Sequence, residues 1–291
     1  MSDQNKGNAM PNKKLLESSP LSGIAVPIAI VLVGALIIFG VTKMLSSGKN
    51  HRDLIDEMNS KTFGNRWVAA YELSKFLAGN KIPKEDMPWV ITNLSQVYKT
   101  SVDPRTRNFV VLALGSLNNP MSLEVLNAGL ADQDPQVRFN AVVSLGNMSQ
   151  GSAIDWTKVA ALFDQETDPG LKQVALFTMA SHKHPTTQEK ALSLLSSGEK
   201  TLRYAAAIVL ISDKKNEAIP VLEEIMGLRY DVAQAGALNG AQVEGLKMNA
   251  LENMEKSGWK DIASLVEKVE QGDSNVRVTT KAKQVLKVLK N

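Results

Sequence analysis

The stretch DPQVRFNAVVSLGNM, residues 134–148, shows where one helix of the protein begins and which face it buries. Asp134 suits the N-cap position, because its carboxylate can accept a hydrogen bond from a backbone N–H of the first turn. Pro135 suits the first helical position, because its φ is already fixed and the N–H that it lacks would be unpaired there. Small or apolar residues follow Arg138 at offsets of three, four and seven, which mark one face of an α-helix.

The same pattern recurs along the chain, mostly at a spacing of about 31 residues, which indicates internal repeats. An acidic residue stands four positions before most of the basic anchors, and a second amphipathic stretch, such as residues 121–131, follows most first helices. Helix pairs of this length cannot bury their faces alone, so the sequence predicts an all-α fold, an α-solenoid of about six to seven stacked pairs over residues 52–291. The anchors are Arg66, Arg107, Arg138, Lys172, Arg203, Lys247 and Arg277.

The helix start D-P-x-x-[RK]-x-x-[AV], together with this spacing, resembles HEAT repeats, especially the short HEAT-like type of phycobilisome lyases. The resemblance covers residues 62–291 and is strongest over 103–212. It implies that the acid and the base of each repeat form a hydrogen-bonded ladder between successive repeats. Lys172 offers only a point charge, and Val243 cannot join, so we expect an interruption before Lys247. The ladder implied by the resemblance consists of Asp103, Arg107, Asp134, Arg138, Asp168, Lys172 and Arg203.

The composition suits closely packed helices and excludes several kinds of site. Hydrophobic residues make up 44% of the chain and aromatic residues only 5%. There are no cysteines, which excludes disulfides, thiolate zinc sites and a cysteine nucleophile. The net charge of +3 does not by itself point to nucleic acid.

Residues 21–41, LSGIAVPIAIVLVGALIIFGV, form an apolar run without a charge. A helix of about 21 residues spans roughly 30 Å, the thickness of the hydrocarbon core, and the run is longer than the apolar part of a signal peptide. We expect a disordered polar tail at 1–20, a transmembrane helix at 21–42 and a short tether at 43–51. This places the protein in the cell (inner or plasma) membrane; flanking lysines leave the orientation open, with a slight preference for a cytoplasmic solenoid.

The sequence contains few candidates for catalysis. His182 and His184 lie in a loop and lack a further metal ligand nearby, so we interpret them as loop residues. Glu223 and Glu224 are adjacent, and adjacent residues on a helix point in different directions, which disfavours a shared role at one substrate. No phosphate-binding, serine-hydrolase or zinc-protease motif is present. We therefore expect no catalytic, metal or cofactor site.

Three features are considered as possible contacts with partners. The long interval before Lys247 contains an insertion at 227–243, where Arg229 and Tyr230 are residue types that often dominate interfaces. Residues 274–291 form a basic amphipathic stretch that either touches anionic molecules or, as we prefer, caps the solenoid. Four tryptophans at repeat-related positions are interpreted as packing residues: Trp67, Trp89, Trp156 and Trp259.

These observations favour a membrane-anchored, non-enzymatic scaffold or adaptor that binds another protein, with the second helices forming a concave wall. The expected partner is a membrane-associated complex, and neither nucleic acid nor a small-molecule substrate is expected. Two alternatives stay open. The resemblance to phycobilisome lyases raises a chromophore lyase-like enzyme, and some HEAT-like proteins cradle nucleic acid.

Overall fold

The computed structural model describes residues 49–60, 66–79, 81–231 and 238–290. The chain divides into two compact units, Met1–Asn50 and His51–Asn291, and the described helices all lie in the second unit. The expected polar tail at 1–20 and the expected transmembrane helix at 21–42 lie outside the described residues. Within the part that is described, no helix is long and apolar enough to cross a membrane.

The second unit consists of α-helices joined by loops and short 3-10 turns, as far as its residues are described. The first helices of the repeats carry the basic anchors near their starts, and a second helix follows each of them except the last. The helices are α2 (His51–Asn59), α3 (Arg66–Ala78), α4 (Met87–Thr100), α5 (Pro104–Ser116), α6 (Leu123–Gly129), α7 (Pro135–Gly146), α8 (Trp156–Gln165), α9 (Pro169–Ser181), α10 (Thr187–Leu194), α11 (Lys200–Leu210), α12 (Ile219–Met226), α13 (Gly240–Ser257), α14 (Ala263–Gly272) and α15 (Val276–Lys290).

The Asp-Pro pairs start three of the first helices. The side chain of Asp134 accepts hydrogen bonds from the backbone N–H groups of Gln136 and Val137, and Pro135 occupies the first turn. Asp103 and Asp168 cap α5 and α9 in the same way. These bonds satisfy donors that would otherwise lack a partner, so the local sequence fixes where each of these helices begins.

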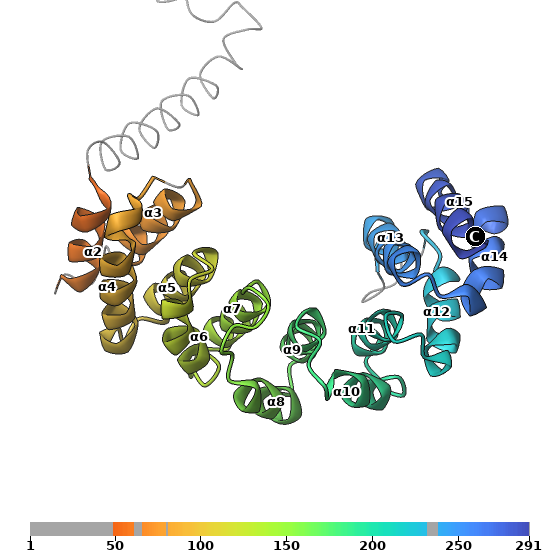
Figure 1. Ribbon diagram of the computed structural model, residues 1–291, viewed down its shortest axis with the longest axis horizontal. Coiled ribbons are helices and arrows are strands. Elements are labelled where there is room, and N and C mark those ends of the chain that lie inside the picture. Colours follow the sequence, from red (N-terminus) through yellow and green to blue (C-terminus); the bar gives the residue numbers. More distant parts are fainter. Residues whose placement is uncertain (1–48, 61–65, 80, 232–237, 291) are drawn as a thin grey trace, which may run out of the picture. The chain divides into compact units, whose positions relative to one another are not determined.

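The first helices stack on one another in chain order, and the second helices pack behind them. Within this unit the stack is curved, and α5, α7, α9 and α11 lie on the inner side of the curve, as Figure 1 shows. The expectation that the second helices form the concave wall is therefore wrong. The reason is packing distance, because the first helices approach one another closely whereas the second helices are spread apart on the outer side.

Small residues make the close approach of the first helices possible. A Cβ atom added at Gly115 would lie 2.1 Å from Ser144 Oγ, and one added at Gly146 would lie 2.8 Å from Thr178 Oγ1. The hydroxyl groups also bridge the helices. Thr178 Oγ1 donates to the carbonyl oxygen of Val142 at 3.0 Å, and the same contact recurs one repeat earlier at Ser144. Side-chain hydrogen bonds thus join α5, α7 and α9 where no large side chain fits.

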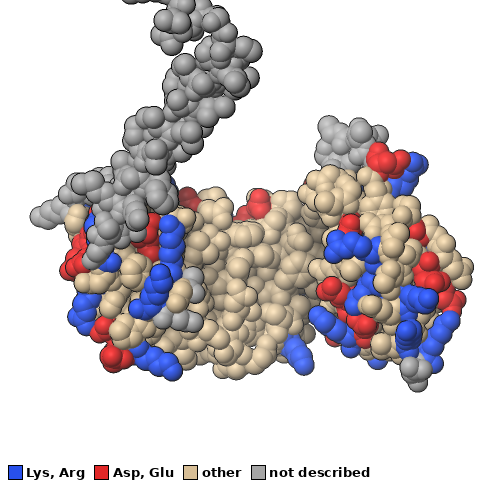
Figure 2. Space-filling view, turned by 90° about the horizontal axis from the view of Figure 1, so that it is seen from above, with Lys and Arg blue, Asp and Glu red and all other residues tan. Residues whose placement is uncertain are grey.

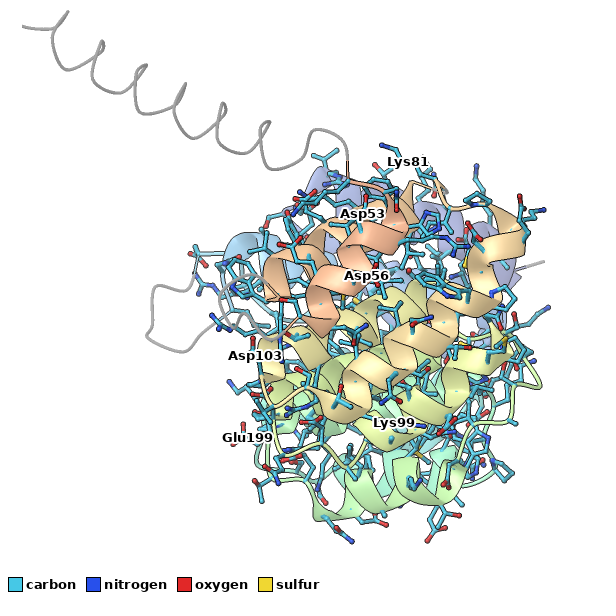
Figure 3. All side chains as sticks on the ribbon, turned by 90° about the vertical axis from the view of Figure 1, so that its left-hand side faces the viewer. Asp53, Asp56, Lys81, Lys99, Asp103 and Glu199 are labelled. Atoms are coloured by element: carbon cyan, nitrogen blue, oxygen red, sulfur yellow. The ribbon has the colours of Figure 1, made fainter. Side chains whose placement is uncertain are left out.

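Both ends of the unit expose polar side chains while burying apolar ones. At the start, α2 buries three apolar residues, and Asp53 and Asp56 lie exposed on its other side (Figure 3). At the end, α15 exposes Thr280 and Gln284, but also Val276 and Val288, so its outer face is only partly polar. The apolar stripe of α15 is buried against the preceding helices at Val278, Ala282, Val285 and Leu289.

Candidate functional site

The anchor arginines join consecutive turns of the solenoid. Arg107 donates from Nε and Nη2 to the two carboxylate oxygens of Asp132, both at 2.8 Å. Its Nη1 donates to the carbonyl oxygen of Ser101 at 3.1 Å. Ser101 lies in the loop before α5, and Asp132 lies in the loop after α6. The planar guanidinium of Arg107 has several N–H donors, so it can bind the loop before α5 and the loop after α6 at the same time.

The same arrangement recurs in other repeats. Arg138 pairs at 3.1 Å with Glu166, in the loop after α8, whereas Arg203 pairs at 3.0 Å with Glu224 of α12, within its own repeat. Four anchor arginines donate to the carbonyl oxygen six residues earlier, and these oxygens belong to Ser60, Ser101, Asp132 and Ser197. The links between repeats thus consist of a backbone contact on one side and an ion pair on the other.

The aspartates of the implied ladder have a different role in the structure. Asp103, Asp134 and Asp168 cap their own helices, and their carboxylates have no recorded hydrogen bond to an anchor side chain among the described residues. Sequence reasoning missed the acids that bind the anchors. Asp132 and Glu166 stand two positions before the N-cap of the next first helix, and this offset is the signal that identifies them. Asp273 has the same offset, whereas Glu224 and Glu244 do not. The acids that bind the anchors are Asp132, Glu166, Glu224, Asp273 and Glu244.

Asp132 is held in its ionised form by the groups around it. Burial by itself would raise the pKa of Asp132, but hydrogen bonds from Arg107, the backbone of Asp134 and the Tyr98 hydroxyl outweigh it, so the pKa lies below its usual value. Tyr98 Oη donates at 2.9 Å from α4, the second helix of the preceding repeat. Burial and this bond to the carboxylate raise the pKa of Tyr98. Three repeats therefore meet at one carboxylate.

Lys172 is the anchor that departs from this pattern. Among the described residues it forms no ion pair, and its Nζ lies 5.4 Å from the centre of the Phe163 ring. The position two residues before the next N-cap holds Ser197, whose Oγ accepts from the backbone N–H of Glu199 at 3.2 Å. A serine thus takes over the backbone contact that an acid makes elsewhere, and the ion pair is lost.

Lys247 is the first anchor after the expected interruption of the ladder, and it forms a buried ion pair. Val243 is buried and contributes no polar group, yet Lys247 Nζ donates to Asp273 Oδ2 at 2.7 Å. The Lys247 side chain is 2% exposed and that of Asp273 3%. Tyr230 Oη donates to Asp273 Oδ1 at 2.7 Å, and the Tyr230 ring lies 4.6 Å from Lys247 Nζ. The insertion thus supplies a tyrosine to this pair.

A cleft of about 810 Å³ opens beside this pair, between α12 and α14. Arg229 and Tyr230, the two candidates for partner contact, both line it. They differ in exposure, since Arg229 is exposed and pairs with Asp231 at 2.8 Å whereas Tyr230 is partly buried against Lys247. The cleft-lining residues are Glu223, Met226, Gly227, Leu228, Arg229, Tyr230, Asp231, Lys247, Leu265, Lys268, Val269, Gly272, Asp273 and Ser274.

A second surface covers the inner side of α5, α7 and α9, and we call it the inner face. Its residues stand one, two and five positions after the anchors, which puts them opposite the buried side of each helix. None of these three helices, nor α11, contains an acidic residue, and Figure 2 shows an uncharged surface between two charged ends. The inner face consists of Asn108, Phe109, Leu112, Phe139, Asn140, Val143, Gln173, Val174 and Phe177.

Aromatic rings and amides supply most of the chemistry of this region. Trp67 of α3 stacks on Phe109 at 6.5 Å between ring centres, and Tyr71 contacts the same ring at 5.6 Å. Asn140 Nδ2 donates to Asn108 Oδ1 at 2.5 Å. Each amide keeps a further donor or acceptor, so the surface combines apolar area with neutral polar groups. Such a surface suits a polypeptide better than a phosphate backbone.

The remaining candidates have structural contacts. The ring of Trp156 lies 5.3 Å from His182 and 4.9 Å from His184, and His182 Nε2 lies 3.1 Å from the carbonyl oxygen of Leu145. Burial, and secondly Lys190, lowers the pKa of His184. The part of the chain that the structure describes holds no group of three or more residues suited to a metal.

The adjacent glutamates and the other tryptophans also separate into distinct environments. Glu224 binds Arg203, whereas Glu223 is exposed at the cleft. Trp259 is buried, and Trp89 lies 4.5 Å below the guanidinium of Arg52. In the basic C-terminal stretch, Arg277, Lys281 and Lys290 pair with Glu244, Glu255 and Glu267.

Comparisons with known proteins agree with this architecture. Residues 91–158 match the family model for HEAT repeats. The chain is similar to the structure of the Escherichia coli protein YibA, with a TM-score of 0.60 at 15% identity, covering 98% of this chain and 99% of that one. It is also similar to the complex of CpcE and CpcF of phycocyanin lyase from Nostoc sp. PCC7120, with a TM-score of 0.53 at 15% identity, covering 83% and 95%.

No curated protein sequence matches the chain. At this level of identity the structural likeness shows the fold alone. The prediction of an all-α, HEAT-like solenoid is confirmed.

Proposed function

We propose that this protein is a non-enzymatic scaffold that binds another protein on the inner face. The neutral character of the inner face carries the proposal. Proteins of this fold commonly bind protein partners, and a partly exposed surface with aromatic and amide side chains but no charge suits the core of such an interface. Leu112 of the inner face is 36% exposed, and Tyr71 of α3, which contacts Phe109 at the edge of that face, is 42% exposed, so apolar area is available for burial.

The charge distribution disfavours nucleic acid at the inner face. Affinity for a phosphate backbone comes from lysines and arginines that neutralise phosphates. The arginines of α5 and α7 do not supply a basic track, because Arg107 and Arg138 are paired with acids at the loops. Binding to the inner face is therefore expected to change little between low and high salt.

The alternative of a chromophore lyase-like enzyme rests on fold similarity to the phycocyanin lyase complex alone. Fold similarity does not carry function, which depends on a site. The described histidines and anchor acids take part in packing or ion pairs, which supports a non-enzymatic protein.

Photocrosslinking tests the proposal. A photoreactive benzoylphenylalanine replaces Phe139 in the full-length chain in cells, and a matched one replaces Met121, an exposed residue outside the inner face. We expect a reproducible protein adduct from position 139 that Leu112→Glu abolishes and Met121→Glu leaves intact. Adducts of equal yield at both positions, or none at position 139, would contradict the proposal.

We also propose that residues 21–42 anchor this scaffold in the membrane, which confines it near membrane-associated partners. Confinement to one surface raises the effective concentration of partners there without new contacts. The uncharged run at 21–41 supports this part of the proposal. Extraction with alkaline carbonate tests it: an anchored protein stays in the membrane pellet, and release into the supernatant would contradict the anchor. Protease protection in spheroplasts then distinguishes a cytoplasmic solenoid from the opposite orientation.

A further inference from the structure

The cleft between α12 and α14 has the size of a binding site. Its volume of about 810 Å³ lies within the range of pockets that hold ligands or the side chains of a bound peptide. The loop Gly227–Asp231 forms one of its walls. This loop belongs to the insertion that lengthens the interval between Arg203 and Lys247, so the cleft exists because the regular stacking of repeats is interrupted there.

Apolar side chains and a buried ion pair both line the cleft. Met226 comes from α12, and Leu265 and Val269 come from α14. Beside them, Tyr230 covers the pair of Lys247 and Asp273. An apolar side chain that enters the cleft would therefore meet apolar atoms on two helices and the side chain of Tyr230.

The charges around the cleft divide into paired and unpaired ones. Arg229 pairs with Asp231, and Lys247 pairs with Asp273. Glu223 on α12 and Lys268 on α14 are exposed, and neither has an ion-pair partner among the described residues. One flanking helix therefore presents a free carboxylate, and the other presents a free ammonium group. Their separation on two helices gives the cleft a negative side and a positive side.

We propose that this cleft is a second docking site, which binds a peptide segment of another protein. The segment carries an apolar side chain with a basic residue on one side and an acidic residue on the other. The apolar side chain enters between Met226 and Val269, the base contacts Glu223, and the acid contacts Lys268. Charge complementarity selects both the composition and the direction of the segment. The proposal is independent of the inner face, which carries no charge.

Peptide display on the full-length protein in detergent tests the proposal. A library of random 12-residue peptides is selected against the wild type, against the charge-swapped variant Glu223→Lys/Lys268→Glu and against a control variant, Glu217→Lys/Lys260→Glu. The control exchanges an exposed acid and an exposed base that do not line the cleft. All four side chains are exposed, so the variants should fold like the wild type.

We expect the wild type and the control to enrich peptides with an apolar residue between opposite charges in one order. The charge-swapped variant should enrich the reverse order and bind the wild-type peptides about tenfold more weakly, because two favourable rim contacts become repulsive. Raising the salt concentration should weaken the binding of the selected peptides to the cleft. Selection of no such peptides, or of the same peptides by wild type and charge-swapped variant, would overturn the proposal. Neither outcome bears on the inner face.

Discussion

The stack of α5, α7 and α9 and the region from α11 to α14 are built from the same repeat but present different surfaces. In the stack, glycine and hydroxyl side chains bring first helices into contact, and the inner face is continuous and neutral. In the second region, the loop Gly227–Asp231 enters between repeats and a charged cleft results. Regularly spaced repeats therefore form a surface suited to apolar contacts with a partner, and the insertion forms a surface suited to binding charged groups of a partner.

Both regions nevertheless contain a triad in which a tyrosine hydroxyl and a basic side chain bind one aspartate. Tyr98, Asp132 and Arg107 meet in the first region, and Tyr230, Asp273 and Lys247 meet in the second. The arginine makes two parallel hydrogen bonds to its carboxylate and is 15% exposed. The lysine makes one and is almost fully buried. The second triad should therefore be more sensitive to loss of its cation, because the Asp273 side chain is 3% exposed and would keep only two neutral donors, the Tyr230 hydroxyl and the backbone N–H of Asn275.

The largest effect is expected from Lys247→Met, which leaves Asp273 ionised and buried without its cation. Breaking a buried pair from one side costs about 3–5 kcal/mol. The free energy of unfolding, measured by urea denaturation, should fall by that amount. Arg107→Met should cost less, about 2–3 kcal/mol, because its pair is closer to solvent.

A double variant checks the cause of this loss. Lys247→Met/Asp273→Leu removes the buried charge, so it should regain part of the stability that the single variant loses. Recovery should be incomplete, because the Tyr230 hydroxyl and the backbone N–H of Asn275 lose their acceptor. A double variant no more stable than Lys247→Met would contradict the account of an unpaired carboxylate.

The first triad should show its contribution in the pH dependence of stability. Asp132→Asn removes a carboxylate that accepts charge-assisted hydrogen bonds, and we expect a loss of about 2 kcal/mol near neutral pH. Hydrogen bonds from Arg107, the backbone of Asp134 and Tyr98 hold the pKa of the folded Asp132 carboxyl below its usual value of 3.8, so its contribution to stability is present above that pH and is lost as the pH falls through the folded pKa.

The measurement compares urea midpoints of wild type and Asp132→Asn between about pH 7 and pH 3, a range that includes the usual pKa of an aspartate. The gap between the two proteins should be constant at the upper end and should narrow at the lower end. A gap that is independent of pH would mean that the carboxylate's charge does not stabilise the fold.

Gly115→Ala tests the close approach of α5 and α7. The added methyl group would meet Ser144, so we expect a destabilisation of about 2 kcal/mol from overpacking. Gly245 of α13 provides the matched control, since nothing lies within 4 Å of a Cβ added there. Gly245→Ala should stabilise the protein by about 0.5–1 kcal/mol through helix propensity. Equal effects of the two alanines would show that the first helices are not in tight contact.

Much of the fold follows from local rules that the sequence displays. Asp134 and Pro135 mark a helix start, and the recurring offsets mark the buried faces, so the solenoid was predictable. The side of the curve was not, because it depends on how closely Gly115 approaches Ser144 in three dimensions. The partners of the anchors also escaped prediction. Asp132 is distant from Arg107 in the chain, and only the folded loops bring the two together.

The cleft escaped prediction for a related reason. The insertion and Tyr230 were recognisable in the sequence, but the volume of the cleft depends on the distance between α12 and α14. The expected interruption lies before Lys247, where Arg203 pairs with Glu224 inside its own repeat, and the pair of Lys247 and Asp273 then links to the following repeat. Local sequence patterns thus do not predict contacts between residues that a loop brings together, because the path of the loop is not known from the sequence.

The repeat rule itself yields the smallest predicted effect, a gain in stability. Among the described residues Lys172 has no acidic partner, and Ser197 occupies the position that Glu166 holds one repeat earlier and Asp132 two repeats earlier. Lys172→Arg/Ser197→Asp should restore the missing pair, since an aspartate there can accept from the backbone N–H of Glu199 as serine does. We expect a coupling energy of about 1 kcal/mol in a double-mutant cycle of urea unfolding, because the pair is partly exposed. Each single variant serves as the control. A coupling of zero would show that position alone does not define the link, and that the bidentate geometry of Arg107 and Asp132 depends on their own repeat.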